Sequence, residues 1–323
     1  MSSKACAVIL AGGEGKRMKS DKPKVLSEVL FRPMLRWVIE AVRAAHITDI
    51  CVVTGHKREY VEDYLSTLPF AVETVFQSER LGTGHAVMTA LPFLERHRGE
   101  QVIVLNGDAP FVDTATVEAV LNASQDTVCT VVSAAVENPF GYGRIVREAD
   151  GHTLCGIVEE KEADDAIRQI HEINSGVYCF AVDALMNALS RLTKSPKTGE
   201  YYLTDTIGIF KADGQQVAVF QADNADSVLG ANDAGQLQEL NEIARQRVLR
   251  RLLQEGVIIP CTDGIIVGTE VTIGRGTVLL PATVLRGQTT IGAHCEIGPA
   301  VLLEDTVIPD NSHVRGTTTV LNG

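Results

Sequence analysis

Between residues 265 and 303, aliphatic side chains recur at a strict interval of six. The aliphatic positions are Val267, Ile273, Leu279, Leu285, Ile291, Ile297 and Leu303. Two residues before each of them stands a β-branched or small residue, namely Ile265, Val271, Thr277, Thr283, Thr289, Cys295 and Val301. Neither an α-helix nor an ordinary strand has a period of six, whereas a hexapeptide solenoid stacks one short strand per repeat. The period predicts a short left-handed parallel β-helix of about two to three triangular coils.

The six-residue interval has limits on both sides. It begins after Gly256, and it is lost at Pro309, where the repeat predicts an aliphatic residue. We therefore place the β-helix over residues 257–323 and expect its regular repeat to end near Pro309.

Residues 5 to about 230 instead alternate short apolar runs with longer segments of helical period. The apolar runs are ACAVILAGG, ICVVTGH, VIVLNGD, TVCTVVSAA, GVYCFAV and VAVFQAD. Segments such as PMLRWVIEAVRAA and TGHAVMTALPFLERH suit crossover helices between the early runs. This alternation predicts an α/β fold with a mixed, mostly parallel sheet that helices cover on both faces. Ligands bind beyond the carboxyl ends of such strands, so LAGG and LNGD should border one crevice.

An amphipathic segment joins the two regions. Its apolar residues recur every three or four positions and form one stripe: Leu237, Leu240, Ala244, Val248 and Leu252. This spacing indicates a helix. The sequence thus predicts an α/β domain over residues 1–232, a linking helix over 233–256 and the β-helix beyond it.

Composition excludes several classes of protein. A net charge of −12 leaves no basic face for general nucleic-acid binding, so we expect no nucleic-acid partner. No apolar run approaches 18 residues and the N-terminus lacks a signal peptide, which predicts a cytoplasmic protein with no membrane span. The seven cysteines contain no CxxC pair, so we expect small buried side chains in a reducing compartment. The eight histidines show no metal-ligand spacing.

Five basic residues gather between positions 16 and 24, directly after Gly12, Gly13 and Gly15. Glycines at a strand end let backbone N–H groups approach a phosphate. Arg17 offers a planar fork to phosphate oxygens, and Lys24 offers a compact charge. The loop matches neither the dinucleotide fingerprint nor the P-loop. The cluster predicts a site for a triphosphate, with a solvated basic loop as the alternative.

Two further residues suit a magnesium ion. Asp108 ends the run VIVLNGD, so its carboxylate should face the glycine loop. Mg²⁺ keeps several waters and takes only one or two protein oxygens, and Asn232 could supply a second, neutral oxygen. The alternatives are a helix-capping role for Asp108 and an N-cap role for Asn232.

Three other stretches place polar groups beside strands. In QSERLGTGHA, Gln77 carries an amide donor and acceptor, and the backbone around Gly82 and Thr83 could face a base edge. Glu159 in GIVEEKE and Asn174 in HEINSGVY could bind sugar hydroxyl or amide groups. An ordinary helix-start turn and surface turns are the alternatives.

Read in order, these stretches resemble the bacterial N-acetylglucosamine-1-phosphate uridylyltransferases. The matching motifs are LAGGEGKRM, DKPK, QSERLGTGHA, LNGD, GYGRI, GIVEEKE, EINSGVY, GEYYLTD and VLGAND. In most bacteria this activity is the N-terminal half of a bifunctional enzyme that continues into a left-handed β-helix acetyltransferase. The resemblance implies a Rossmann-like nucleotidyltransferase domain that makes UDP-N-acetylglucosamine and pyrophosphate from UTP and N-acetylglucosamine 1-phosphate, with Mg²⁺. It also implies a role in cell wall biosynthesis and a homotrimer assembled through the β-helix.

Roles for individual residues follow from the matched motifs. Leu10, Ala11, Gly12 and Gly13 are expected to contact the nucleotide, and Gln77, Gly82 and Thr83 the uracil. Arg17 and Lys24 are the expected catalytic residues, which bind the phosphates. Asn106, Gly107 and Asp108 line the site, with Asp108 and Asn232 on Mg²⁺. Gly143, Glu159 and Asn174 are expected to hold the N-acetylglucosamine part.

The chain departs from the family in three places. Ala11-Gly12-Gly13 replaces the common Ala-Ala-Gly, a form shared with relatives that use other nucleotides, and Asn106 replaces an aromatic residue. The sequence also ends before the catalytic histidine and acetyl-CoA site of full-length relatives, so we expect no acetyltransferase activity. Two alternatives remain: a uridylyl- or thymidylyltransferase for another sugar 1-phosphate, and a catalytically silent regulatory homologue.

Overall fold

The computed structural model describes residues 4–316 and 319–321, with side chains from residue 4 to 316 apart from that of Lys16. The chain divides into two compact units. The first comprises Met1–Ser27 and Pro33–Asp233, and the second comprises Glu28–Arg32 and Ala234–Gly323.

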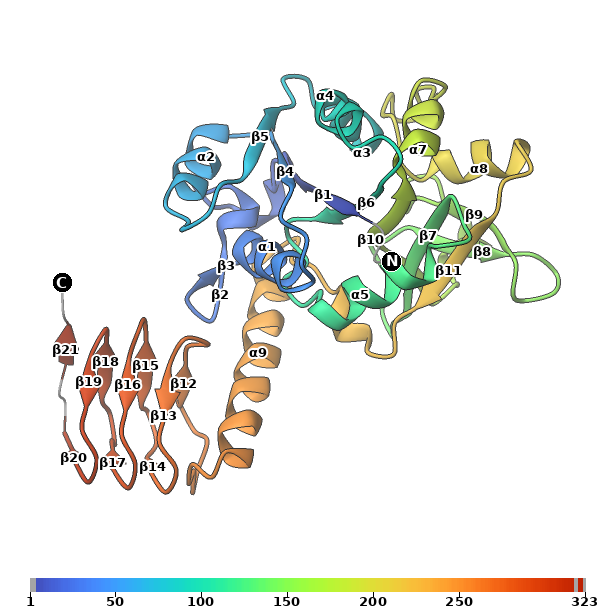
Figure 1. The fold of residues 1–323 in the computed structure, drawn as a ribbon. Helices are drawn as coiled ribbons and strands as arrows, with labels where there is room; N and C mark the ends of the chain where they lie inside the picture. The colour runs from blue at the N-terminus through green and yellow to red at the C-terminus, as the bar shows by residue number, and fades with distance from the viewer. Residues whose placement is uncertain (1–3, 317–318, 322–323) are drawn as a thin grey trace. The chain divides into compact units, whose positions relative to one another are not determined.

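A mixed sheet forms the centre of the first unit (Figure 1). Its main strands are β11 (Val217–Gln221), β7 (Cys129–Ala135), β10 (Glu172–Ala181), β6 (Gln101–Asn106), β1 (Ala5–Ala11), β4 (Ile50–Thr54) and β5 (Glu73–Phe76), in that spatial order. Strand β10 runs antiparallel to β6 and β7, whereas the other neighbours on this path are parallel. The hairpin of β8 (Arg144–Arg147) and β9 (Leu154–Val158) pairs with β10. The predicted mixed, mostly parallel sheet is confirmed.

Helices cover both faces of this sheet because its strands are apolar on both faces. In β1, Ala7 and Ile9 belong to one buried cluster, and Cys6 and Val8 to the other. The first cluster packs against α1 (Met34–Ala44), α2 (Arg58–Ser66) and α5 (Thr114–Ala123). The second packs against α3 (Thr83–Thr89), α4 (Leu91–Glu95), α7 (Val182–Leu189) and α8 (Asp205–Ala212). The period of two along a strand places successive side chains on opposite faces, which makes a two-sided core.

Short helical segments complete the first unit. They are η1 (Lys16–Met18), η2 (Lys24–Leu26), α6 (Asp165–Arg168) and η3 (Ala225–Val228). The segment expected to be helical over residues 83–97 is divided between α3 and α4, with a break at Ala90. Pro92 lies in the first turn of α4, where its missing N–H costs no hydrogen bond.

In the second unit, helix α9 (Ala234–Gln254) lies beside the turn between β2 (Glu28–Val29) and β3 (Arg32–Pro33). The buried face of α9 is the predicted stripe from Leu240 to Leu252, while Leu237 is half-buried. The side chain of Asn241 holds the turn: it accepts from Leu30 N at 3.0 Å and donates to Glu28 O at 3.2 Å. The short segment Glu28–Arg32 of the N-terminal part of the chain thus belongs to the second unit.

The rest of the second unit is a parallel β-helix with three stacks of short strands (Figure 1), in keeping with the left-handed β-helix predicted. One stack contains β12 (Ile266–Val267), β15 (Val284–Arg286), β18 (Leu302–Glu304) and β21 (Thr319–Leu321). The second contains β13 (Thr272–Ile273), β16 (Thr290–Ile291) and β19 (Val307–Ile308), and the third β14 (Val278–Leu279), β17 (Glu296–Ile297) and β20 (His313–Val314). Every residue predicted to point inward is buried except Ile273, which is half-buried.

The strict six-residue repeat ends before Pro309, as expected, but the coil itself continues beyond it. Ile291 pairs with Ile308, a step of 17 residues, whereas Val267 pairs with Leu285, a step of 18. The corner after β18 contains residues 305–306, one fewer than the corner 287–289 after β15. Thr306 and Ile308 take the two places that the strict repeat assigns to residues 307 and 309, and Thr306 is 6% exposed. The coil therefore continues in a register shifted by one residue.

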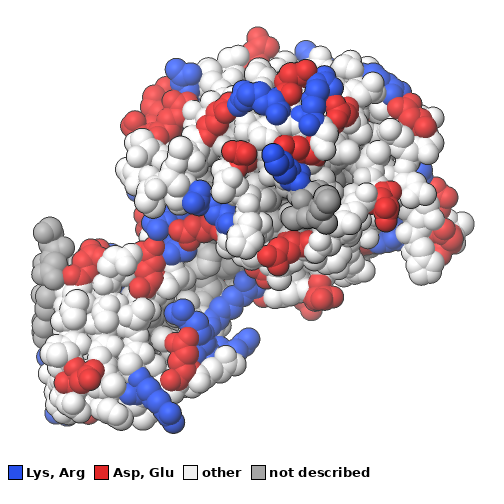
Figure 2. All heavy atoms as spheres, in the orientation of Figure 1, with Lys and Arg blue, Asp and Glu red and all other residues white. Residues whose placement is uncertain are grey.

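Cysteines and charges follow the sequence-based expectations in most respects. All seven cysteines are free, and five are buried, while Cys155 is exposed and Cys261 is half-buried. Within the described part of the chain, no helix has both the length and the apolar character needed to cross a bilayer. On the face drawn in Figure 2, acidic and basic side chains are interspersed.

Candidate active site

The carboxyl ends of β1 and β6 meet at one edge of the sheet. These strands are parallel neighbours, and Leu10 pairs with Asn106. Gly107 N donates to Leu10 O at 2.9 Å, which joins the residue after β6 to the carboxyl-terminal part of β1. The sequences LAGG and LNGD therefore border one crevice, as predicted.

This crevice has two adjoining parts within the first unit. The larger is a cleft of about 740 Å³ and the smaller is a hollow of about 160 Å³. Predicted residues that line only the cleft are Gly12, Gly13, Lys24, Gln77 and Gly82. Those that line only the hollow are Gly143, Asn174 and Asn232, and those that line both are Leu10, Thr83, Asn106, Asp108 and Glu159. The cleft's volume falls within the usual range of small-molecule sites, about 300–1,000 Å³.

Three predicted site residues line neither part. Ala11 and Gly107 are buried, so they lie within the strand ends rather than at the cleft surface. Arg17 lies in η1 with an exposed side chain, and it makes no ion pair with any residue of the described chain. The structure thus brings Lys24 to the cleft but leaves Arg17 in solvent.

A cluster of three polar side chains lies where the cleft meets the hollow. The Lys24 ammonium forms an ion pair with the Asp108 carboxylate and donates to Asn232 Oδ1 at 2.9 Å. The Lys24 and Asp108 side chains are 13% and 19% exposed, so solvent screens this pair only in part. Three segments far apart in the sequence therefore converge on one cationic position.

The oxygens at this position suit a magnesium ion. Asp108 and Asn232 already share one cation, the ammonium of Lys24, so their oxygens converge on a common point. The described residues contain no cluster of three or more His, Cys, Asp and Glu side chains placed for a metal. A site with one carboxylate and one amide oxygen leaves most coordination positions to water or substrate, which is typical of Mg²⁺.

Gln77 has a fixed orientation at the floor of the cleft. It is 5% exposed, and its Nε2 donates to Gly82 O at 3.1 Å. The same nitrogen lies 3.1 Å from His85 Nδ1, so both amide hydrogens are engaged when that ring nitrogen is unprotonated. The remaining polar atom, Oε1, faces the glycine loop, because a Cβ on Gly12 would lie 3.1 Å from it. This carbonyl oxygen can accept a hydrogen bond from an imide N–H.

The turn before α3 is clamped to the segment around Tyr201. Gly84 N donates to Tyr201 O at 2.8 Å, and Leu203 N donates to Thr83 Oγ1 at 3.1 Å. Gly82 has φ +103°, and a Cβ there would overlap the backbone of Tyr201. Only glycine fits this position, since the conformation and the contact both exclude a side chain.

Glu159 and Asn174 form the polar wall of the hollow. Glu159 accepts from Thr204 Oγ1 at 3.0 Å, and burial raises the pKa of its carboxyl. Asn174 Nδ2 donates to Tyr178 Oη at 2.6 Å. Burial also raises the pKa of Tyr178, so its hydroxyl stays protonated. A ligand here meets acceptors and donors suited to hydroxyl and amide groups.

Several charged residues of the cleft escaped prediction. Arg80 and Glu14 lie 3.0 Å apart as an ion pair, and Lys161 and Glu200 form another at 2.9 Å. Arg80 lies in the motif QSERLGTGHA and Glu14 lies in LAGGEGKRM. Their positions in loops that are predicted to face the ligand are the sequence feature that could have identified them.

Comparisons with known proteins agree with this geometry. A family model described as nucleotidyl transferase matches residues 6–248. The bifunctional protein GlmU of Acetivibrio thermocellus is 41% identical over 313 residues, which cover 96% of this chain and 67% of that protein. The chain belongs to the GlmU family of nucleotidyl transferases. GlmU of Geobacillus thermodenitrificans is 40% identical over 314 residues, again 67% of its length.

The solved structures support the fold. A crystal structure from Bacillus anthracis, of a protein assigned as a glucose-1-phosphate thymidylyltransferase, has a TM-score of 0.59. It covers 75% of this chain and 95% of its own at 21% identity, so the likeness concerns the fold alone. The chain spans about two thirds of the length of the GlmU relatives named above.

Proposed function

We propose that this GlmU-family chain transfers a uridylyl group from UTP to N-acetylglucosamine 1-phosphate, which yields UDP-N-acetylglucosamine and pyrophosphate. The observation that carries the proposal is the position of the cluster Lys24–Asp108–Asn232. Asp108 lines both the cleft that begins at the glycine loop and the hollow that holds Glu159 and Asn174. A nucleotide in the cleft and a sugar in the hollow therefore meet at that cluster.

In this reaction a phosphate oxygen of the sugar phosphate forms a bond to the α-phosphorus of UTP. The bond from that phosphorus to the bridging oxygen breaks, and pyrophosphate leaves with the electron pair. The attacking oxygen is already anionic, so no strong general base is needed. The main obstacle is the approach of two polyanions, which an enzyme relieves by positioning and by charge neutralisation.

We assign the chain's own cations to this task. Lys24 borders the cleft and supplies a compact positive charge to phosphate oxygens. Arg17 stands on the same glycine loop with an exposed guanidinium that is not held by a carboxylate of the described chain, so it is available to a phosphate. We assign both residues to the stabilisation of the pyrophosphate leaving group.

Mg²⁺ is the cofactor that fits this donor set. When bound, it supplies Lewis-acid polarisation of phosphate oxygens and a template that orients both substrates. Asp108 and Asn232 are the residues that would hold it. Lys24, which they hold in the free chain, then becomes available to phosphate.

The two ends of the site explain the choice of substrates. The Oε1 atom of Gln77 accepts from the imide N–H of uracil, which cytosine lacks. Glu159 accepts from sugar hydroxyl or amide N–H groups, and Asn174 adds a second polar contact. Uracil and thymine both carry the imide, and one methyl group is worth only about 1–3 kcal/mol in a pocket.

A substrate panel tests the proposal directly. Each of UTP, TTP, CTP and GTP is combined with N-acetylglucosamine 1-phosphate, glucose 1-phosphate or galactose 1-phosphate, with and without Mg²⁺, and pyrophosphate release is measured. We expect the highest kcat/KM for UTP with N-acetylglucosamine 1-phosphate. A higher value for another pair would assign a different substrate, and no turnover with any pair would favour the catalytically silent homologue.

Three further expectations stay predictions. We infer a homotrimer built through the β-helix, so deletion of residues 257–323 should lower the number of subunits per particle, calculated from the light-scattering mass and the mass of the shortened chain; an unchanged number of subunits would contradict this. We also expect a cytoplasmic location. The expected lack of acetyltransferase activity is checked by acetyl-CoA turnover with glucosamine 1-phosphate.

A further inference from the structure

One arginine of the first unit is buried almost completely. Arg144, the first residue of β8, is 1% exposed. Its Nη2 donates to Glu160 Oε2 at 2.8 Å and its Nη1 donates to Tyr142 O, while its buried Nε has no hydrogen-bond partner among the described residues. A buried charge is costly unless it is paired, and a buried pair is often no more stable than an apolar one. The burial of Arg144 therefore calls for a reason other than stability.

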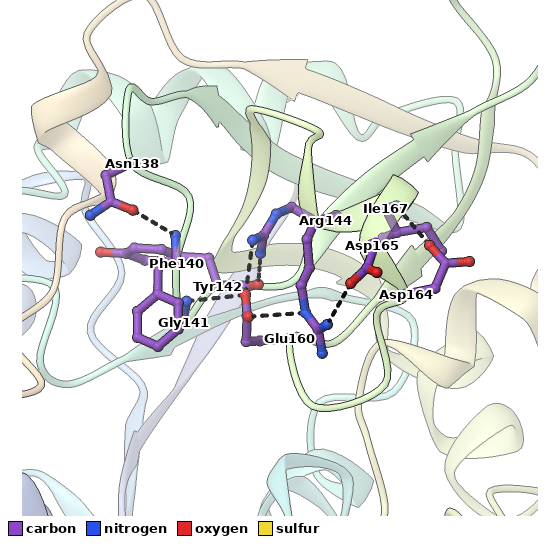
Figure 3. Close-up of polar contacts among 10 residues, drawn as sticks. Asn138, Phe140, Gly141, Tyr142, Arg144, Glu160, Asp164, Asp165 and Ile167 are labelled. Atoms are coloured by element: carbon purple, nitrogen blue, oxygen red, sulfur yellow. Dashed lines mark hydrogen bonds and ion pairs between the residues drawn. The ribbon is translucent and has the colours of Figure 1, made fainter.

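Glu160 is the centre of the contacts around Arg144. Figure 3 shows its carboxylate between Gly141 and Arg144. Its Oε2 accepts from Gly141 N at 3.2 Å as well as from Arg144, and its Oε1 lies 3.6 Å from Arg168 Nε in α6. One side chain thus ties the loop before β8 to the segment after β9.

The inner neighbours of this pair line the candidate site. Gly143 precedes Arg144, Glu159 precedes Glu160, and both line the hollow. A Cβ on Gly143 would lie 3.5 Å from Glu159 Oε2, so these two segments approach closely there. Because adjacent residues share a backbone, the ion pair of Arg144 with Glu160, which also lines the cleft, sets the separation of Gly143 and Glu159.

We propose that Arg144 and Glu160 are positioning residues for the sugar-phosphate end of the site. Their ion pair holds Gly141–Gly143 and Glu159 at the spacing that the sugar requires. This inference rests on the proposed function, because it names the part of that site that the pair controls. Glu160 itself lines the cleft, but its hydrogen bonds and ion pairs in the described structure join it to Gly141, Arg144 and Arg168, and none joins it to Gly12 or Gln77 at the nucleotide end. We therefore expect loss of the pair to affect the sugar end more than the nucleotide end.

The matched control is a second arginine–glutamate pair on the same strand. Arg147, also in β8, lies 2.6 Å from Glu172 at the start of β10, and neither residue lines the cleft or the hollow. The side chains of this control pair are 23% and 17% exposed, so it is also partly buried. Its loss perturbs the same hairpin without touching the sugar end.

The test compares Glu160→Gln, Arg144→Lys and Glu172→Gln with the full wild-type chain. Displacement of about 1 Å by a distant substitution can cost on the order of 100-fold. We therefore expect the KM for N-acetylglucosamine 1-phosphate to rise by about tenfold in the first two variants, with the KM for UTP within about twofold. Glu172→Gln should leave both KM values unchanged. Binding of UDP-N-acetylglucosamine and of UTP, measured by calorimetry, should show the same split.

The KM values of these variants distinguish a positioning role from a general structural role. Glu160→Gln keeps the shape of the side chain and one acceptor oxygen, and Glu160→Ala, which keeps neither, should give the larger rise. Equal increases in both KM values, an equal effect of Glu172→Gln, or an unchanged sugar KM would overturn the inference. If the wild type itself neither turns over nor binds these substrates, the proposed function fails first.

Discussion

Gly176 in β10 offers a sharp test of how the site is built. It lies at an irregularity of the strand, between Asn174 and Tyr178, where the pairing register with β7 shifts. Its φ is +77°, and a Cβ there would lie 2.9 Å from Asn106 Cγ and would overlap Asn106 Nδ2. Gly176→Ala therefore strains the backbone and displaces the Asn106 side chain, which lines both the cleft and the hollow.

The cost can be worked out from these two effects. A residue with a Cβ in the left-handed region costs about 1–2 kcal/mol. Forcing Asn106 away from its rotamer adds about 0.5–1.5 kcal/mol. The unfolded chain loses freedom when glycine becomes alanine, which returns about 0.4–1 kcal/mol. The expected loss in free energy of unfolding is therefore about 0.5–3 kcal/mol.

A second glycine separates the two effects. Gly214 has φ +68° and open space around its Cβ, so Gly214→Ala carries only the backbone strain. Trp37 is the single tryptophan and lies in α1 of the first unit, so its fluorescence during urea unfolding reports that unit. We expect Gly176→Ala to be the less stable variant by about 0.5–1.5 kcal/mol. Its kcat/KM should also fall by about tenfold or more, which corresponds to about 1.4 kcal/mol.

Stability and activity together test whether the contact with Asn106 shapes the site. If Gly176→Ala lowers stability no more than Gly214→Ala and retains wild-type kcat/KM, then the contact with Asn106 does not shape the site. If both glycine variants lose activity equally, backbone strain alone accounts for the effect, and the reasoning about Asn106 is refuted.

Three other predictions follow from the site. Arg17→Ala should lower kcat by about 100- to 1,000-fold without a change in the urea midpoint, because a lost charge contact costs about 3–4 kcal/mol of transition-state stabilisation; a near-normal steady-state rate would disprove the role. Removal of Mg²⁺ with a chelator should abolish pyrophosphate release, and Asp108→Asn should raise the Mg²⁺ concentration needed for half-maximal rate; an unchanged requirement in the variant would place the ion elsewhere. Burial raises the pKa of Glu159 in the folded chain, so its contribution to stability falls as the pH rises from about 4.3, the usual value in the unfolded chain. Glu159→Gln should therefore gain more stability over the wild type at pH 7 than at pH 4, and equal gains in urea midpoint would contradict the shift.

The fold was largely predictable because its core residues repeat. The inward positions of the β-helix are uniform, and the apolar runs of β1, β4 and β6 are long enough to indicate buried strands. Strand β5 was missed because its residues Glu73–Phe76 are largely exposed and carry no continuous apolar run. The direction of β10 was not predictable either, since an apolar run reads the same in a parallel and an antiparallel pair.

The site was predictable where a motif supplied it. Strand-end motifs placed Asp108 and Gln77 at the crevice, but no local pattern indicates that Lys24 pairs with Asp108, 84 positions away. Arg144 was missed because an arginine in a strand motif is ordinarily exposed, and only the tertiary structure reveals its burial. The one-residue shift after Leu303 depends on the length of a corner, which a strict period cannot anticipate.

The cation shared by Asp108 and Asn232 has a thermodynamic consequence. Lys24 cannot hold Asp108 and a phosphate anion at full strength together. Under the proposed function, a nucleotide that attracts Lys24 would therefore free Asp108 for the divalent ion. Thermodynamic linkage makes this coupling reciprocal. The factor by which bound nucleotide raises the affinity for the ion equals the factor by which the bound ion raises the affinity for nucleotide. The dissociation constant of each ligand is measured with and without the other, and the two ratios should be equal. Lys24→Met should bring this ratio closer to one.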